Sequence, residues 1–195
     1  FANLNPENCK VIVCHLGNGA SISAVQDGKC IDTSMGFTPL AGIMMGTRSG
    51  DIDPAVVTYL MRKTGMDADE VENVLNKKSG MLGVSELSSD ARDIEAGVNA
   101  GNEQAILTQK LYINRVINTV GGYIAQMGGV DAIVFTGGIG ENDSKIRLGI
   151  ANALNGAFGV KIDADKNQVR GEETLLSTPD SRVALWLIPT NEELM

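Results

Sequence analysis

The chain has 195 residues, of which 43% are hydrophobic and 21% charged, so it can bury a sizeable core and general disorder is excluded. Its formal net charge of −8 argues against a nucleic-acid-binding protein, because the phosphates would be repelled. No apolar run approaches the roughly 18 residues that a membrane-spanning helix needs. We therefore expect neither a nucleic-acid partner nor a membrane protein.

Glycine is the compositional outlier, with 23 residues, while aromatic residues make up only 4%. Many glycines stand beside Asn, Thr, Ser or Arg, which predicts backbone that comes close to a ligand as well as ordinary turns. The three cysteines, Cys9, Cys14 and Cys30, have no C-x-x-C spacing. This argues against a disulfide framework or a structural zinc site and favours a reducing, cytoplasmic location.

The first part of the chain predicts three short strands and then a loop and a helix. The strands are expected over residues 11–14, 21–26 and 29–33, with Asp27 and Gly28 as the hairpin turn of the last two. Residues 36–50 are rich in glycine and have neither strand nor helix periodicity, so they predict a loop. Asp53 followed by a proline predicts the start of a helix that ends at Gly65.

The second part alternates helices and strands. Helices are expected over residues 67–77, 103–127 and 144–155, and another is expected to begin at residues 90–93 with Ser89 as its cap. Loops are expected over residues 79–85 and 137–142. Gly121 and Gly122 predict a kink or a close helix contact. Buried strands are expected over residues 132–136, 160–163 and 184–188. An antiparallel meander followed by strand–helix–strand units indicates an α/β fold with a mixed sheet.

The end of the chain resembles the start of a helix. Thr190 and Glu193 have the spacing of a capping box, yet only Leu194 and Met195 follow them. From this pattern we predict that the chain is an excised part of a longer protein.

The first candidate site is the segment 15–21, where two glycines and Asn18 connect the first two predicted strands. Successive N–H groups in such a turn can converge on an anion, and Asn18, Ser21 and His15 add side-chain donors. The alternative is a plain hairpin with positive φ at Gly17, Asn18 or Gly19. His15, the single histidine of the chain, stands where the loop opens and favours ligand contact.

The second candidate site is the segment 46–53, in which glycines flank Arg48. A guanidinium can bind two phosphate oxygens at once, although a surface salt bridge is the alternative. Asp51 and Asp53 offer metal ligands, but Asp53 is better explained as a helix cap.

A third candidate site is the glycine-rich segment 137–142 between a strand and a helix, which favours a ribose or phosphate over the loop. It is not a dinucleotide-binding fingerprint, because the third glycine is replaced by Asp143, and the chain contains no P-loop sequence. Taken alone, the segment 88–93 is an ordinary helix start, and Glu192 and Glu193 are ordinary capping residues.

Together these segments resemble the acetokinase family, the acetate kinases of the actin–Hsp70–hexokinase superfamily. The resemblance is carried, in order along nearly the whole chain, by the segments 15–21, 32–40, 42–54, 79–83, 135–142 and 189–193. It implies a ribonuclease-H-like (actin-like ATPase) α/β domain with a mixed five-stranded sheet flanked by helices. It also implies that residues 1–195 form a C-terminal nucleotide-binding domain whose N-terminal partner domain is absent.

The resemblance also implies roles for individual residues. Arg48 matches the arginine that stabilises the phosphoryl group during transfer, and Glu192 matches a glutamate that helps to hold Mg²⁺. The residues implied to bind ATP or ADP are His15, Leu16, Gly17, Asn18, Gly19, Asp90, Ala91, Arg92, Gly138, Ile139, Gly140, Glu141 and Asn142.

The implied reaction is acetate + ATP ⇌ acetyl phosphate + ADP by direct in-line transfer. Because the family draws further catalytic groups from the N-terminal domain, we expect this chain alone to bind nucleotide weakly, to form a homodimer and not to turn over acetate. A propionate or butyrate kinase of the same family is one alternative. A nucleotide-binding or dimerisation module without catalytic activity is another.

Overall fold

The computed structural model describes residues 4–191, which form two compact units. One unit contains the chain up to Ser34 and again from Ile113 onward, and the other is Met35–Tyr112. The first unit contains the β-sheet. The second consists of helices and a long loop. Over the described residues, no helix combines the length and the apolar character that a membrane crossing requires.

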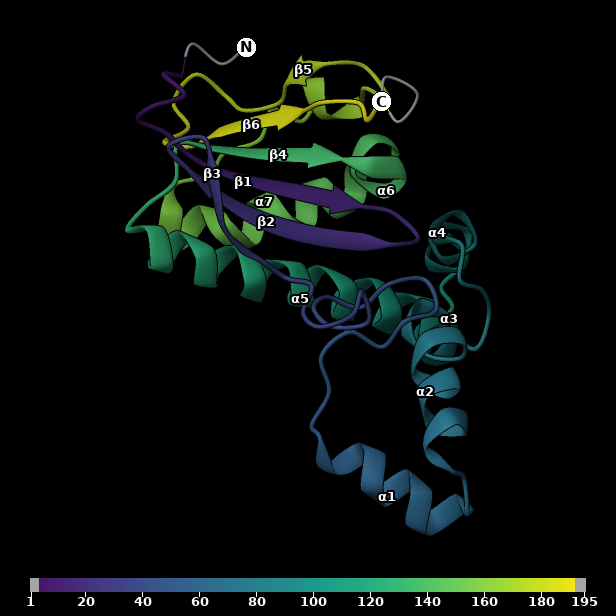
Figure 1. The fold of residues 1–195 in the computed structure, drawn as a ribbon. Coiled ribbons are helices and arrows are strands. Elements are labelled where there is room, and N and C mark those ends of the chain that lie inside the picture. The colour runs from purple at the N-terminus through teal and green to yellow at the C-terminus, as the bar shows by residue number, and fades with distance from the viewer. Residues whose placement is uncertain (1–3, 192–195) are drawn as a thin grey trace. The chain divides into compact units, whose positions relative to one another are not determined.

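A six-stranded mixed sheet forms the centre of the first unit (Figure 1). In chain order its strands are β1 (Lys10–Leu16), β2 (Ala20–Gln26), β3 (Lys29–Thr33), β4 (Ala132–Thr136), β5 (Thr174–Leu175) and β6 (Ala184–Leu187). They are arranged in the order β3-β2-β1-β4-β6-β5. Strands β1, β4 and β6 are parallel, whereas β2, β3 and β5 are antiparallel to their neighbours. The predicted α/β class with a mixed sheet is confirmed.

The sheet has one strand more than the five expected. The additional strand, β5, is two residues long and pairs with the edge of β6. The strand expected over residues 160–163 was wrong, because only Ile162 forms an isolated bridge, with Ser177. A single bridge satisfies too few backbone groups to make a strand, so Val160 is buried without its segment joining the sheet.

Strands β1 and β2 show the alternation that one buried face imposes. Ile12, Cys14 and Leu16 are completely buried, and the residues between them are half-buried. Burial also raises the pKa of the Cys14 thiol to about 12. The turn between β2 and β3 has positive φ at Asp27 and Gly28, 51° and 74°, as expected for a tight hairpin.

Helices α5 (Glu103–Met127) and α7 (Ser144–Phe158) run along the sheet (Figure 1). They pack closely, because a Cβ added to Gly149 would lie 2.8 Å from Ile113 Cδ1. Asp143 begins α7 by accepting hydrogen bonds from two first-turn N–H groups. The close helix contact expected at Gly121 and Gly122 was wrong, since added Cβ atoms there would meet nothing within 4 Å.

The segment predicted as a glycine-rich turn is the short helix α6 (Gly137–Asn142), which follows β4 directly. The turn prediction failed because the reversal takes place at one residue, Gly137, whose φ is 77°. A 3₁₀ turn, η1 (Lys166–Gln168), packs against α7.

The second unit contains α1 (Ala55–Thr64), α2 (Ala68–Lys77), α3 (Gly80–Ser85), α4 (Ala91–Asn99) and the first turns of α5. Asp67 and Glu70 form a capping box that starts α2, and Gly65 ends α1 in the left-handed region. Asp53 Oδ1 accepts the N–H of Ala55, as expected for a helix start.

Two predictions for this unit were wrong. The segment 79–85 is helical, because the N–H groups at the start of α3 donate to carbonyl oxygens of the loop that includes Met45. The cap of α4 is Asp90 and not Ser89, since Asp90 Oδ1 accepts the N–H of Arg92.

Candidate functional site

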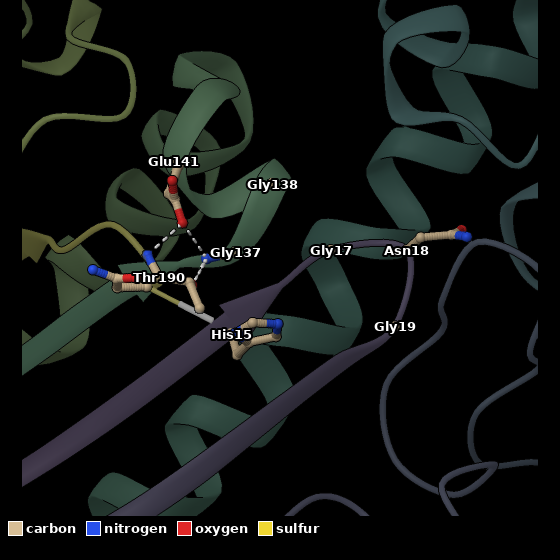
Figure 2. Close-up of a pocket in the computed structure, with 9 residues that line it drawn as sticks. His15, Gly17, Asn18, Gly19, Gly137, Gly138, Glu141 and Thr190 are labelled. Atoms are coloured by element: carbon tan, nitrogen blue, oxygen red, sulfur yellow. Dashed lines mark hydrogen bonds between the residues drawn. The ribbon is translucent and has the colours of Figure 1, made fainter. Parts of the chain in front are cut away.

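Three strand ends meet at one edge of the sheet. Because β1, β4 and β6 are parallel, with His15 opposite Thr136 and Phe135 opposite Leu187, the segments that follow these strands open on the same side. Ligands in open α/β sheets bind at the carboxyl ends of the strands. A cavity of about 590 Å³ lies here (Figure 2). It is lined by His15, Gly17, Asn18, Gly19, Gly137, Gly138, Glu141, Thr190 and Asn191.

The turn between β1 and β2 forms one wall of this cavity. None of Gly17, Asn18 and Gly19 has a positive φ, so the hairpin alternative with positive φ was wrong. The N–H groups of Asn18 and Gly19 donate to no acceptor among residues 4–191. Gly17 is confined, since an added Cβ would lie 3.0 Å from Gly19 O. The side chain of Asn18 projects from the tip of the turn, away from Glu141 (Figure 2).

Gly137, at the start of α6, forms part of the opposite wall and contacts His15. Its φ of 77° favours glycine, and a Cβ there would lie 2.9 Å from Leu16 O and 3.2 Å from both His15 Cε1 and Nε2. The imidazole therefore packs directly on the start of α6. The next residue, Gly138, is exposed, and an added Cβ would meet nothing within 4 Å.

A small hydrogen-bond network closes the back of the cavity. Glu141 Oε1 accepts the N–H of Gly137 at 2.9 Å and the N–H of Thr190 at 2.9 Å. Thr190 Oγ1 accepts the Gly137 N–H at 3.1 Å and lies 2.6 Å from Thr136 Oγ1. The start of α6 is thus joined to the segment that follows β6 (Figure 2).

The other end of α6 is held by a buried arginine. Arg147, on α7, has no exposed surface, and its Nη1 donates to Gly140 O at 2.9 Å. Its Nε and Nη2 donate to Asn167 Oδ1, Asn167 O and Val169 O. Burial lowers the pKa of Arg147 to about 10, which leaves it charged at neutral pH. Sequence reasoning missed this residue, because a lone arginine on a predicted helix does not reveal its burial.

Other residues expected at the site do not line the cavity. Leu16, Ile139 and Gly140 are buried beneath it. Asn142 is exposed and donates from its side-chain amide to Gly138 O, so it stabilises α6 itself.

The remaining predicted residues belong to the Met35–Tyr112 unit. Arg48 is half-buried and donates from Nη1 to Pro39 O at 3.3 Å and to the sulfur of Met45. Asp51 Oδ1 accepts the Gly42 N–H, a structural role that does not need a metal.

At the start of α4, Asp90 forms a bidentate pair with the exposed Arg92. The hydrogen bond from the Arg92 side chain lowers the pKa of Asp90 to about 2. Ala91, the first residue of α4, is half-buried.

No metal centre is found within residues 4–191, where no three His, Cys, Asp or Glu side chains gather suitably. Glu192, expected to help hold Mg²⁺, and Glu193, expected in the capping box, lie outside the described residues.

Two cavity-lining residues, Thr190 and Asn191, were missed as site residues, whereas Gly137 lies in the candidate segment 137–142 without having been among the residues implied to bind nucleotide. The pairing of parallel strands was the signal that could have found them. A predicted strand over residues 184–188 that joins the sheet in parallel brings the next residues to the same edge as Gly138.

The fold and the position of the cavity define the class of protein. It is an α/β protein of the actin-like ATPase class, with a mixed sheet flanked by helices. In the solved structures, acetate kinase from Porphyromonas gingivalis superposes with a TM-score of 0.94 at 46% identity, covering 97% of this chain and 48% of that one. Propionate kinase from Francisella tularensis gives 0.90 at 44% identity, covering 96% and 48%.

The sequence comparisons establish the family. The acetokinase family model matches residues 1–195, and the chain belongs to that family. Acetate kinase of Phocaeicola vulgatus is 56% identical over 195 residues, which are 100% of this chain and 49% of the relative. The chain therefore spans about half the length of the curated relatives it matches.

Proposed function

We propose that the whole protein to which this chain belongs is an acetate kinase that catalyses acetate + ATP ⇌ acetyl phosphate + ADP. An acetate oxygen attacks the γ-phosphorus, and the bond from that phosphorus to the bridging oxygen breaks, so that ADP leaves. Family membership and the names of the relatives support the proposal. Because the chain spans half of those relatives, the activity is proposed for the whole protein and not for this chain alone.

The observation that carries the proposal is the glycine-lined cavity at the carboxyl edge of β1, β4 and β6. Its volume of about 590 Å³ lies within the range of ligand pockets. The N–H groups of Asn18 and Gly19, which lack acceptors among the described residues, are suitable donors for phosphate oxygens. Phosphoryl transfer depends mainly on such positioning and on charge stabilisation.

The roles of the other residues follow the same chemistry. His15 would contact the nucleotide phosphates from the end of β1. Leu16, Ile139 and Gly140 are buried, so they would act by shaping the backbone of the cavity walls. Arg48, whose guanidinium is only partly engaged, would stabilise the transferred phosphoryl group.

The proposed nucleotide site also includes a part that binds adenosine. We assign Asp90, Ala91, Arg92, Gly138 and Asn142 to it, as the family resemblance implies. The pairing of Asp90 with Arg92 fixes the first turn of α4, which supports a defined surface there.

We also propose Mg²⁺ as the metal cofactor, with Glu192 as a protein ligand. When bound, Mg²⁺ would neutralise phosphate charge during transfer. This assignment comes from the family resemblance, since no three His, Cys, Asp or Glu side chains gather suitably among the described residues.

The proposal is tested first by titrating this chain with ADP calorimetrically, with and without Mg²⁺. Saturable binding would show that the cavity binds nucleotide without the rest of the protein. No heat up to millimolar ADP would mean that binding needs the other half of the protein. The whole protein is then assayed for acetyl phosphate formation from acetate and ATP, and failure to form it would refute the proposal.

A second candidate is a propionate kinase, favoured by the solved propionate kinase at 44% identity. Comparing kcat/KM for acetate, propionate and butyrate in the whole protein decides between them. A module that binds nucleotide or dimerises without catalysis is the remaining alternative, and it predicts that the whole protein forms no acetyl phosphate. If the whole protein does form it and Arg48→Ala leaves phosphoryl transfer within a few-fold, the role proposed for Arg48 is wrong.

We further propose a homodimer formed through this part of the protein and a cytoplasmic location. The negative net charge and the three free cysteines support the location. Sedimentation of the whole protein tests the dimer.

A further inference from the structure

The hydrogen-bond network behind the cavity gives Glu141 a role different from ligand binding. We propose that Glu141 is a positioning residue, which holds the start of α6 to the segment after β6 and thereby keeps two walls of the cavity together. This inference rests on the proposed function, because the cavity is taken to be the nucleotide site. We call Thr136, Gly137, Glu141 and Thr190 the latch.

The geometry of the latch centres on one oxygen atom. Glu141 Oε1 accepts two backbone N–H groups, from Gly137 and Thr190, each at 2.9 Å (Figure 2). These two donors lie 53 residues apart in the chain, and they come from the beginning of α6 and the loop after β6. A single side-chain oxygen thus connects the start of α6 to the loop after β6, which no hydrogen bond of the sheet does.

Thr190 provides a second connection between the same two segments. Its Oγ1 accepts the Gly137 N–H at 3.1 Å and lies 2.6 Å from Thr136 Oγ1. The Gly137 N–H is therefore shared between a carboxylate and a hydroxyl. The Gly137 N–H lies in the first turn of α6, where the helix itself provides no acceptor. The carboxylate and the hydroxyl therefore satisfy a donor that would otherwise have no partner.

Charge argues against direct phosphate binding by Glu141. A carboxylate that faces phosphates repels them, and the repulsion is strong in a partly buried site. Glu141 is half-buried and lines the cavity. Accepting two N–H groups disperses its negative charge onto the backbone. What the site needs from this residue is therefore the oxygen acceptor and not the charge.

This distinction makes glutamine at position 141 the decisive substitution. The amide oxygen of Gln can still accept both N–H groups, whereas Ala removes the acceptor. A residue that acted through its charge, as on a metal ion, would lose its function in both variants. A residue that accepted a ribose hydroxyl would leave amide exchange at Gly137 and Thr190 unchanged in Glu141→Ala.

The experiment uses the whole protein with Glu141→Gln, Glu141→Ala and, as a charge control, Glu172→Gln, an exposed acid outside the cavity. We measure Kd for ADP, KM for ATP, kcat, and amide hydrogen exchange at Gly137 and Thr190. Glu141→Ala should raise Kd and KM about tenfold, with a smaller change in kcat, and should accelerate exchange at both amides. Glu141→Gln should restore Kd and KM to within about threefold of the unsubstituted protein.

An equal loss in Glu141→Gln and Glu141→Ala would overturn the inference, as would unchanged exchange at both amides in Glu141→Ala. If Glu141→Ala does not fold, Thr190→Val removes the second acceptor of Gly137 and should accelerate exchange at that amide. If the unsubstituted protein makes no acetyl phosphate, the proposed function fails, while amide exchange still decides whether the latch exists.

Discussion

Gly80 lies against the loop that carries Arg48, and its replacement by alanine gives a demanding test of the second unit. The φ of Gly80 is +61°, and an added Cβ would lie 2.2 Å from Met45 O and 2.7 Å from Arg48 O. Both carbonyls are already used, because Met45 O accepts the Met81 N–H at 2.8 Å and Arg48 O accepts the Met45 N–H at 3.1 Å. The methyl group therefore cannot be accommodated by a side-chain movement.

The magnitude follows from a comparison with Gly65. Gly65 has a similar φ, +77°, but an added Cβ there would meet nothing within 4 Å. Gly65→Ala should therefore cost only the left-handed conformation, about 1 kcal/mol. Gly80→Ala adds overpacking of about 1 kcal/mol and the disturbance of two hydrogen bonds at about 1 kcal/mol each. We expect Gly80→Ala to lower the free energy of unfolding by about 4 kcal/mol.

Urea denaturation of both variants, followed by circular dichroism, measures these losses. If Arg48 acts in phosphoryl transfer, Gly80→Ala should also lower kcat of the whole protein by roughly 100-fold, since a displacement of about 1 Å can have that effect. Equal stability losses for Gly80→Ala and Gly65→Ala would refute the reasoning from the contacts of Gly80.

Other substitutions test the remaining contacts. Arg147→Met leaves four hydrogen-bond acceptors without their donor, so it should lower the free energy of unfolding by about 3 kcal/mol. Urea denaturation measures this loss, and a value below about 1 kcal/mol would contradict the contacts described. Cys30 is exposed and should react with a thiol reagent in the folded protein, whereas Cys14, with its pKa raised to about 12, should react only after unfolding. Mass spectrometry identifies the modified residue, and labelling of Cys14 in the folded protein would be inconsistent with its burial. The pKa of Asp90, about 2, lies below its usual value, so the pairing with Arg92 favours the folded state above pH 4 and is lost as the pH falls toward 2. In Arg92→Ala, an NMR titration should show a higher pKa for Asp90 that stays below the usual value of about 4, because the backbone N–H of residue 92 still donates to Asp90 Oδ1. An unchanged pKa would show that the Arg92 side chain is not the main cause.

The strands and long helices were predictable because their periodicity and caps are local. The alternation in β1, the capping pair Asp67 and Glu70, and the left-handed Gly65 are all visible in the sequence. The short elements were not predictable from the sequence. Helix α3 depends on carbonyls of the distant loop that includes Met45, and β5 depends on an edge that β6 offers. Long-range partners of this kind have no local signal.

The site was predictable where glycines revealed it and unpredictable where ordinary residues complete it. The turn at Asn18 and the start of α6 were found through their composition. Thr190 resembled a helix cap, and nothing local indicates that its N–H and hydroxyl face Glu141 and Gly137. Leu16 was included because the family resemblance implied it, and the alternation of β1 places its side chain in the core.

The parallel arrangement of β1, β4 and β6 also sets an order of assembly. Its three strands are separated by more than a hundred residues and then by about fifty, so the cavity cannot exist until contacts of very long range have formed. During synthesis, which proceeds from the N-terminus, the turn at Asn18 emerges before Thr190, and the wall is incomplete until Thr190 has emerged as well. A nascent chain that stops after β4 would expose the unpaired edge of that strand to other chains.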